Sequence, residues 1–233
     1  MTTVTNRPFN FGAGPAALPT ELLLEIQSEL LDWQGLGMSV MEVGHRTEAF
    51  MQLLQDAEDL LRRLLNIPNS YHVLFLGGAA RLQFGMIAEN FITEQQQAGY
   101  LVSGLWSSMA FQEAARIKKA YCIASGENTG FTAVPPVDNW VYQENTAYCY
   151  FAPNETVNGL RCSTLPTEQN IPVVADMTSC LLSESLNIND YAFIFAGAQK
   201  NIANAGLTMV IVADSFIQSI RNDALLTMLD YRT

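Results

Sequence analysis

Seven short apolar runs between residues 71 and 212 constrain the fold of this chain more than any other feature. The last two, residues 191–196 and 207–212, are almost entirely apolar, which is typical of strands covered by helices on both faces. Helical patterns lie between several runs, notably at residues 82–95 and 106–118. The sequence therefore predicts an α/β fold with a mainly parallel seven-stranded sheet and helices on both faces. The expected strands are residues 71–76, 100–103, 120–124, 146–151, 171–175, 191–196 and 207–212.

The length and composition of the chain fit such a fold and argue against other classes. The 233 residues leave room for one large domain with a substantial core. Nearly half of the residues are apolar and only 15% are charged, which indicates a soluble globular protein and not a disordered one. The net charge of -11, without any run of Lys or Arg, argues against nonspecific binding to nucleic acid or to an anionic membrane. An anionic substrate would need individually placed arginines.

The chain carries no recognisable signal for export, membrane insertion or metal binding. Residues 1–10 do not resemble a targeting signal, and no stretch approaches 18 consecutive apolar residues, so we expect a cytoplasmic protein. The four cysteines show no C-x-x-C spacing, and the two histidines, His45 and His72, lie in different segments. We therefore expect no metal site.

The first 70 residues are expected to form an extended lead-in and two helices. Residues 9–19 are rich in Gly and Pro, and we place within them the boundary between an N-terminal extended segment, residues 1–15, and a main domain, residues 16–233. Apolar spacing predicts helices at residues 20–33 and 47–65. Arg46 precedes the second helix, at the end of the helix dipole that disfavours a cation, which suggests a role other than helix stability. A solvated arginine explains this position equally well.

Lys200 lies in the loop between the last two expected strands, and it is the first candidate for chemistry. Rigid strands on both sides would hold the loop, and Gln199 and Asn201 are polar neighbours. A lysine that is kept from water there can lose its proton and act as a nucleophile, as Schiff-base chemistry requires. The alternative is a lysine at a strand end whose ammonium simply reaches water.

Ligands of parallel sheets bind beyond the carboxyl ends of the strands, which directs attention to the segments that follow them. After the first strand, residues 77–81 read Gly-Gly-Ala-Ala-Arg and open a helix, where backbone N–H groups would suit a phosphate. A tight turn that binds nothing is the alternative, and no nucleotide-binding glycine pattern is present. After the second strand, Trp106 opens a helix, either as a stacking surface or as part of the core.

Asp176 ends the fifth expected strand, at the mouth of an apolar run. A carboxylate in such surroundings must be paired or hydrogen-bonded to remain charged. An Asp at a strand mouth, a Lys on a later loop and an earlier glycine-bearing loop together meet the needs of pyridoxal phosphate. They would provide a partner for the pyridinium nitrogen, an anchor for the aldehyde and a cradle for the phosphate.

Four segments resemble the phosphoserine aminotransferase family, which belongs to the fold-type-I pyridoxal-phosphate enzymes. They are residues 14–19 (Gly-Pro-Ala-Ala-Leu-Pro), 32–46, 153–156 (Pro-Asn-Glu-Thr) and 197–201 (Gly-Ala-Gln-Lys-Asn). The resemblance covers essentially the whole chain, and it implies that residues 16–233 form the large, cofactor-binding domain. It also implies a C-terminal small domain beyond Thr233, so we expect that the chain lacks part of the family's length.

The resemblance also implies the roles of individual residues. Lys200 would form the covalent bond to pyridoxal 5′-phosphate, and Asp176 would pair with the ring nitrogen. Trp106 would stack on the ring, and Thr156 and Gln199 would hydrogen-bond the cofactor. Backbone groups of Ala80 and Arg81 would bind the cofactor phosphate, and Arg46 would bind the anionic substrate.

The activity implied by the resemblance is amino transfer between L-glutamate and 3-phosphohydroxypyruvate by a homodimer. The products would be O-phospho-L-serine and 2-oxoglutarate, in serine biosynthesis and, for some members, in pyridoxine synthesis. Two alternatives stay open. One is another fold-type-I aminotransferase, such as a relative of alanine-glyoxylate transaminase, and the other is a truncated, non-catalytic remnant.

Overall fold

The computed structural model describes residues 7–166, 168 and 170–233, and the chain divides into two compact units. The first unit extends to Ile67 and the second comprises Pro68–Thr233. The sequence-based boundary between residues 15 and 16 stays a prediction, and residues 1–6 of that segment lie outside the described residues.

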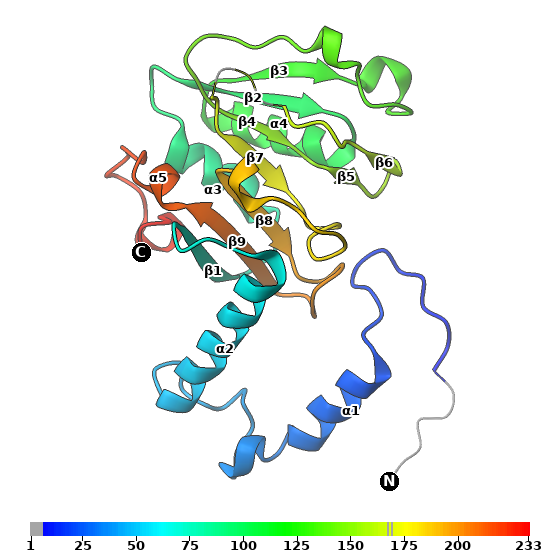
Figure 1. The fold of residues 1–233 in the computed structure, drawn as a ribbon, viewed down its shortest axis with the longest axis vertical. Helices are drawn as coiled ribbons and strands as arrows, with labels where there is room; N and C mark the ends of the chain where they lie inside the picture. Colours follow the sequence, from blue (N-terminus) through cyan, green and yellow to red (C-terminus); the bar gives the residue numbers. More distant parts are fainter. Residues whose placement is uncertain (1–6, 167, 169) are drawn as a thin grey trace. The chain divides into compact units, whose positions relative to one another are not determined.

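The first unit contains two helices, α1 (Thr20–Glu29) and α2 (Glu48–Leu65) (Figure 1). Helix α2 matches its prediction because both of its ends are capped: Thr47 Oγ1 accepts a hydrogen bond from Phe50 N, and Asn66 adopts the left-handed conformation. Helix α1 ends four residues before its predicted end. Its continuation passes into a short 3-10 turn, Trp33–Gly35, in which Gln34 has a positive φ.

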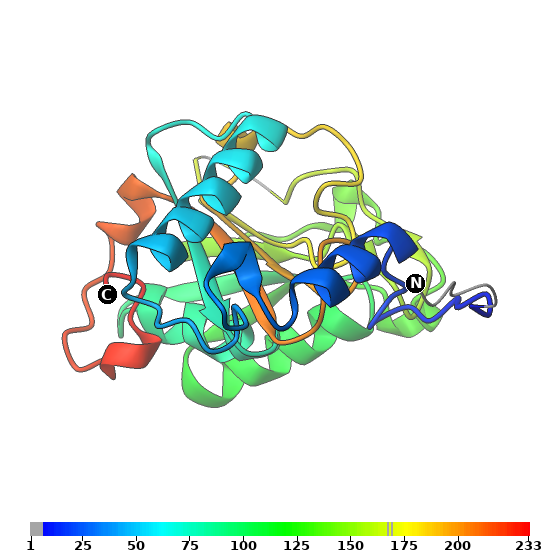
Figure 2. The ribbon, with the colours of Figure 1, turned by 90° about the horizontal axis from the view of Figure 1, so that it is seen from below.

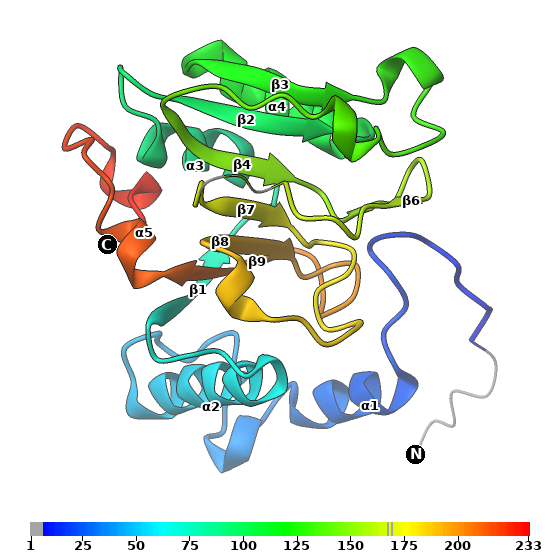
Figure 3. The ribbon, with the colours of Figure 1, turned by 45° about the horizontal axis from the view of Figure 1, so that its top comes forward.

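The second unit is built on a seven-stranded sheet whose order is β1-β9-β8-β7-β4-β2-β3, which Figure 3 shows most clearly. Strand β9 runs antiparallel to its neighbours β1 and β8, and the other pairs are parallel. The prediction of a mainly parallel seven-stranded sheet is confirmed. The strands are β1 (Tyr71–Gly77), β2 (Gln97–Val102), β3 (Ala120–Ser125), β4 (Thr146–Phe151), β7 (Val173–Asp176), β8 (Phe193–Gly197) and β9 (Leu207–Ala213).

Helices α3 (Leu82–Phe91) and α4 (Leu105–Ile117) pack against each other, and α4 contacts β2 and β3 (Figure 2). Helix α3 is shorter than predicted because Ile92 turns to an extended conformation. A short helix, α5 (Asp214–Ile217), follows β9, and 3-10 turns span Glu127–Thr129, Val137–Asn139, Ile188–Asp190 and Thr227–Leu229.

The central strands form the core, since every residue of β7 and β8 is buried. The core here includes six aromatic side chains that are at most 1% exposed, and most of these rings pack edge to face or tilted against another ring. These rings are Tyr100, Tyr148, Tyr150, Phe151, Phe193 and Phe195. Burial on this scale fixes the carboxyl ends of the parallel strands at one edge of the sheet.

One element beyond β4 was not predicted. Residues Asn154–Glu155 (β5) and Leu160–Arg161 (β6) pair as a small antiparallel hairpin.

Among the described residues, no helix combines the length and the apolar character that crossing a membrane requires.

Candidate active site

Lys200 lies in the turn between β8 and β9, at the edge where the parallel strands end. Its side chain is half-buried, its Nζ donates a hydrogen bond to Thr156 Oγ1, and it lies 5.2 Å from the centroid of the Trp106 ring. Burial lowers the pKa of Lys200, and the Asp176 and Glu155 carboxylates oppose that shift. The lysine is thus held where a larger fraction of its amine is neutral than in water.

Asp176 is the last residue of β7 and is 7% exposed. Its Oδ1 accepts a hydrogen bond of 3.0 Å from Thr178 N, and the Tyr150 hydroxyl lies 3.5 Å from its Oδ2. Burial raises the pKa of Asp176, although the hydrogen bonds from Thr178 and the charge of Lys200 act in the opposite direction. Within the described part of the chain, no lysine or arginine forms an ion pair with this carboxylate. It is therefore suited to a cationic group of a ligand.

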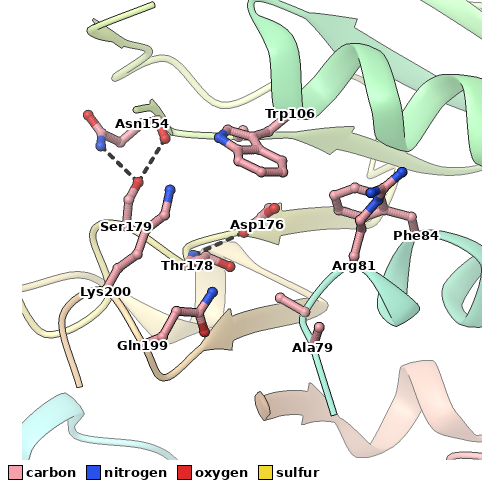
Figure 4. A pocket seen from close by; sticks show the side chains of 12 residues that line it. Ala79, Arg81, Phe84, Trp106, Asn154, Asp176, Thr178, Ser179, Gln199 and Lys200 are labelled. Carbon is pink, nitrogen blue, oxygen red and sulfur yellow. Dashed lines mark hydrogen bonds between the residues drawn. The ribbon is translucent and has the colours of Figure 1, made fainter. Parts of the chain in front are cut away.

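A cavity of about 180 Å³ brings these two residues together with most of the other predicted site residues (Figure 4). In Figure 4 the Trp106 indole lies across the cavity from Gln199, with Asp176 between them. The residues that line the cavity are Ala79, Ala80, Arg81, Phe84, Trp106, Ala152, Asn154, Asp176, Thr178, Ser179, Gln199 and Lys200.

One end of the cavity is formed by backbone where α3 begins. Residues Ala79, Ala80 and Arg81 precede the first helical residue, Leu82, and among the described residues the amides of Ala80 and Arg81 donate no hydrogen bond. Free N–H groups at a helix start suit an anion such as a phosphate. Gly197 approaches this turn closely, since a Cβ there would lie 3.0 Å from the Cβ of Ala80.

Thr156 does not line the cavity, but it connects two residues that do. Its Oγ1 accepts hydrogen bonds from Lys200 Nζ and, at 3.1 Å, from Trp106 Nε1. The sequence predicted Lys200, Trp106 and Thr156 as cofactor contacts, but not that the Thr156 hydroxyl would bind both of the other two side chains. Arg46 lies exposed in the turn before α2, in the first unit, and its role stays a prediction.

Sequence reasoning missed several residues of the site, among them Thr178, whose N–H binds Asp176. Asn154 and Ser179 exchange hydrogen bonds at the cavity wall, each 2.8 Å long. Glu155 is fully buried and binds the start of α4. A signal for Glu155 was present, because a carboxylate next to an apolar strand, with no cation within five residues along the chain, needs other partners.

The arrangement is suited to a reaction on a bound planar cation. It combines a half-buried amine of lowered pKa, a buried carboxylate, an indole and a backbone turn with free N–H groups in one cavity. Among the described residues, no group of three His, Cys, Asp or Glu side chains is placed to hold a metal ion.

Comparison with known proteins identifies the family. The sequence profile described as Aminotransferase class-V matches residues 8–226. The chain belongs to the class-V aminotransferase family. The fold is that of the fold-type-I aminotransferases, as the sequence motifs indicated.

Among sequence relatives of this class-V aminotransferase, the phosphoserine aminotransferase of Legionella pneumophila (strain Philadelphia 1) is 53% identical over 98% of the chain. Among solved structures, the phosphoserine aminotransferase of Bacillus circulans subsp. alkalophilus is 39% identical, with a TM-score of 0.93 over 97% of the chain. That of Trichomonas vaginalis, solved with pyridoxal phosphate bound, is 36% identical, with a TM-score of 0.91 over 97% of the chain. The chain spans 63% of the length of each of these relatives. The resemblance to phosphoserine aminotransferases is confirmed.

Proposed function

We propose that the protein is a phosphoserine aminotransferase that uses pyridoxal 5′-phosphate. It transfers an amino group between L-glutamate and 3-phosphohydroxypyruvate to give O-phospho-L-serine and 2-oxoglutarate, a step of serine biosynthesis. The observation that carries the proposal is the convergence of Lys200, Asp176 and Trp106 on one cavity, in a chain 53% identical to a phosphoserine aminotransferase. The hydrogen bonds that Thr156 Oγ1 accepts from both Lys200 and Trp106 support it.

The residues of the cavity fit the cofactor. The free amides of Ala80 and Arg81 would bind the phosphate, and Gln199 would hydrogen-bond the ring substituents. Trp106 would cover one face of the ring, while Asp176 would hold the protonated ring nitrogen, which supplies the cation that this carboxylate lacks. When bound, pyridoxal phosphate supplies an electron-withdrawing ring that weakens the Cα–H bond of the amino acid.

Lys200 would anchor the cofactor and then move a proton. The lowered pKa favours a neutral Nζ, which is the form that attacks an aldehyde carbon and accepts a proton from the substrate Cα. Thr156 Oγ1 and the Trp106 ring hold Nζ on the cavity side of its loop. The hydrogen bond from Thr178 N fixes the Asp176 carboxylate, which would hold the protonated ring nitrogen of the cofactor during the reaction.

Substrate recognition, assembly and location belong to the same proposal. The substrates carry phosphate and carboxylate groups, and a chain of net charge -11 needs arginines close to them, of which Arg46 would be one. We propose that the protein acts as a cytoplasmic homodimer, as its resemblance to the phosphoserine aminotransferases implies. A further role in pyridoxine synthesis also stays a proposal.

Amino-acceptor specificity tests this proposal. The protein is loaded with pyridoxal phosphate, and L-glutamate turnover is measured with 3-phosphohydroxypyruvate and with glyoxylate. We expect kcat/KM to be larger for 3-phosphohydroxypyruvate. Equal or faster turnover of glyoxylate would instead favour an aminotransferase of the alanine-glyoxylate type, and no turnover of either acceptor would favour a non-catalytic chain.

A further inference from the structure

Glu155 is a fully buried carboxylate for which the proposed reaction has no use. In the part of the chain that the structure describes, it forms no ion pair with a lysine or an arginine. Burying an ionised carboxylate without a cation is costly unless hydrogen bonds replace the lost water. The partners of Glu155 therefore indicate why a carboxylate occupies this position.

Among the described residues, the hydrogen bonds to the Glu155 carboxylate all come from the first turn of α4. Its Oε2 accepts from Trp106 N at 2.9 Å, and its Oε1 accepts from Ser107 N at 2.7 Å and from Ser107 Oγ at 2.6 Å. These amides belong to the N–H groups that a helix start leaves without partners, and the positive end of the helix dipole favours a negative charge there. The cap of α4 thus comes from a residue 49 positions away from Trp106 in the sequence.

The helix start is shaped to receive this distant cap. Gly104, which precedes α4, has no side chain, and a Cβ on it would lie 2.6 Å from Glu155 Cδ. Asn158, in the same hairpin as Glu155, accepts a hydrogen bond of 3.0 Å from Leu105 N. The first three amides of α4 are therefore all bound by the β5–β6 hairpin.

The bonds of Glu155 join two segments that each carry a proposed cofactor contact. Trp106 lies in the segment after β2, and Thr156 lies in the segment after β4, next to Glu155 in the chain. The side chains of these two residues are joined by the Trp106 Nε1–Thr156 Oγ1 hydrogen bond of 3.1 Å, and the backbone N–H of Trp106 is bound by Glu155. Loss of the hydrogen bonds to the carboxylate would release the Trp106 backbone, and the indole would then no longer be held in one position. The charge of Glu155 also raises the pKa of Lys200, against the larger effect of burial.

We infer that Glu155 is a positioning residue, whose buried carboxylate sets the Trp106 indole and the Thr156 hydroxyl at the cofactor cavity by capping α4 from the β5–β6 hairpin. The role of those two side chains rests on the proposed function, whereas the cap does not. An amide cannot replace the carboxylate. Three donors converge on its two oxygens, so a glutamine would oppose its NH₂ group to the N–H of Trp106 or Ser107.

The test compares Glu155→Gln with a matched control, Glu184→Gln. Glu184 is an exposed carboxylate that pairs with Arg161, on the other strand of the same hairpin. The first readout needs no cofactor: the indole N–H resonances of Trp33, Trp106 and Trp140 in the ¹H–¹⁵N NMR spectrum, with Trp106→Phe to assign them. We expect Glu155→Gln to shift or broaden the Trp106 resonance alone and Glu184→Gln to change none of the three.

The second readout is the Kd for pyridoxal phosphate, which we expect to rise at least tenfold in Glu155→Gln and to stay within twofold of wild type in Glu184→Gln. If Glu155→Gln does not fold, Glu155→Asp serves in its place. It keeps the charge but is one methylene too short to reach all three donors, and we expect the same changes at smaller size. An unmoved Trp106 resonance in a folded Glu155 variant overturns the inference. Failure of wild type to bind pyridoxal phosphate at Lys200 overturns the proposed function and leaves the NMR result to decide on the cap.

Discussion

Burial moves the pKa values of Lys200 and Asp176 in opposite directions, and both shifts make the residues less charged. The cavity without ligand therefore holds two ionisable groups at some cost in stability. A ligand that brings a cation to Asp176 and a carbonyl carbon to Lys200 would relieve both. Active sites commonly trade stability for function in this way.

The Asp176 shift predicts a pH-dependent stability change. The folded-state pKa is raised above the unfolded value of 3.8, so folding favours the protonated form, and that contribution is lost as the pH rises through the folded pKa. Asp176→Asn removes the ionisable group and should raise the Tm of the cofactor-free protein at neutral pH, by roughly 2–4 °C for each kcal/mol of cost removed. The gain should shrink as the pH falls toward 3.8, and circular dichroism melts at several pH values measure it. A Tm gain that stays the same at every pH would show that the ionisation of Asp176 is not its cause.

The same substitution should impair catalysis. Asn cannot hold a proton on the ring nitrogen, so Asp176→Asn should slow the half-reaction with O-phospho-L-serine by on the order of a hundredfold or more. Stopped-flow absorbance of the bound cofactor measures this rate. Asp138→Asn, which changes an exposed aspartate in a 3-10 turn, is the control and should react like wild type. Normal half-transamination by Asp176→Asn would remove Asp176 from the mechanism.

At the scale of elements, the sequence predicted the existence of all seven strands because each is an apolar run that must be buried. It did not indicate the antiparallel direction of β9, although the short connection after β8 was a usable signal, since parallel neighbours need a crossover of about a dozen residues. The β5–β6 hairpin has two-residue strands and no apolar alternation, so no periodicity could reveal it. The cap by Glu155 depends on contacts between distant segments and appears only in three dimensions.

Two glycines in elements around the cavity predict opposite stability changes. Gly85 lies in α3, where a Cβ would meet Ile117 Cδ1 at 3.7 Å, so Gly85→Ala should stabilise the protein by about 0.5–1 kcal/mol. Gly197 ends β8, where a Cβ would lie only 3.0 Å from the Cβ of Ala80, a side chain that cannot rotate away, so Gly197→Ala should destabilise it by about 1–3 kcal/mol. Urea unfolding measures both changes. Changes of the same sign would contradict the described packing.

At the scale of the whole molecule, the predicted site residues fall into two groups. Those that follow strands of the sheet were predictable, because parallel topology brings strand ends to one edge whatever the details of the loops. Arg46 belongs to the first unit, and only a family resemblance connects it with the cavity.

The same resemblance supports the proposed homodimer, which sedimentation at several protein concentrations tests. We expect a dimer, and a monomer at every concentration would contradict it.

The central claim is that Lys200 binds pyridoxal phosphate covalently, and the chain is well suited to a direct test because it contains only three lysines. The other two, Lys118 and Lys119, precede β3 at the opposite edge of the sheet, where Lys118 pairs with Glu89 and Lys119 Nζ donates to Glu94 O. The protein is incubated with pyridoxal phosphate, reduced with borohydride to trap the linkage, and digested for peptide mass spectrometry. We predict about one label per chain, on Lys200, and none in Lys200→Ala. A label on Lys118 or Lys119 that persists in Lys200→Ala, or no label at all, would contradict the account.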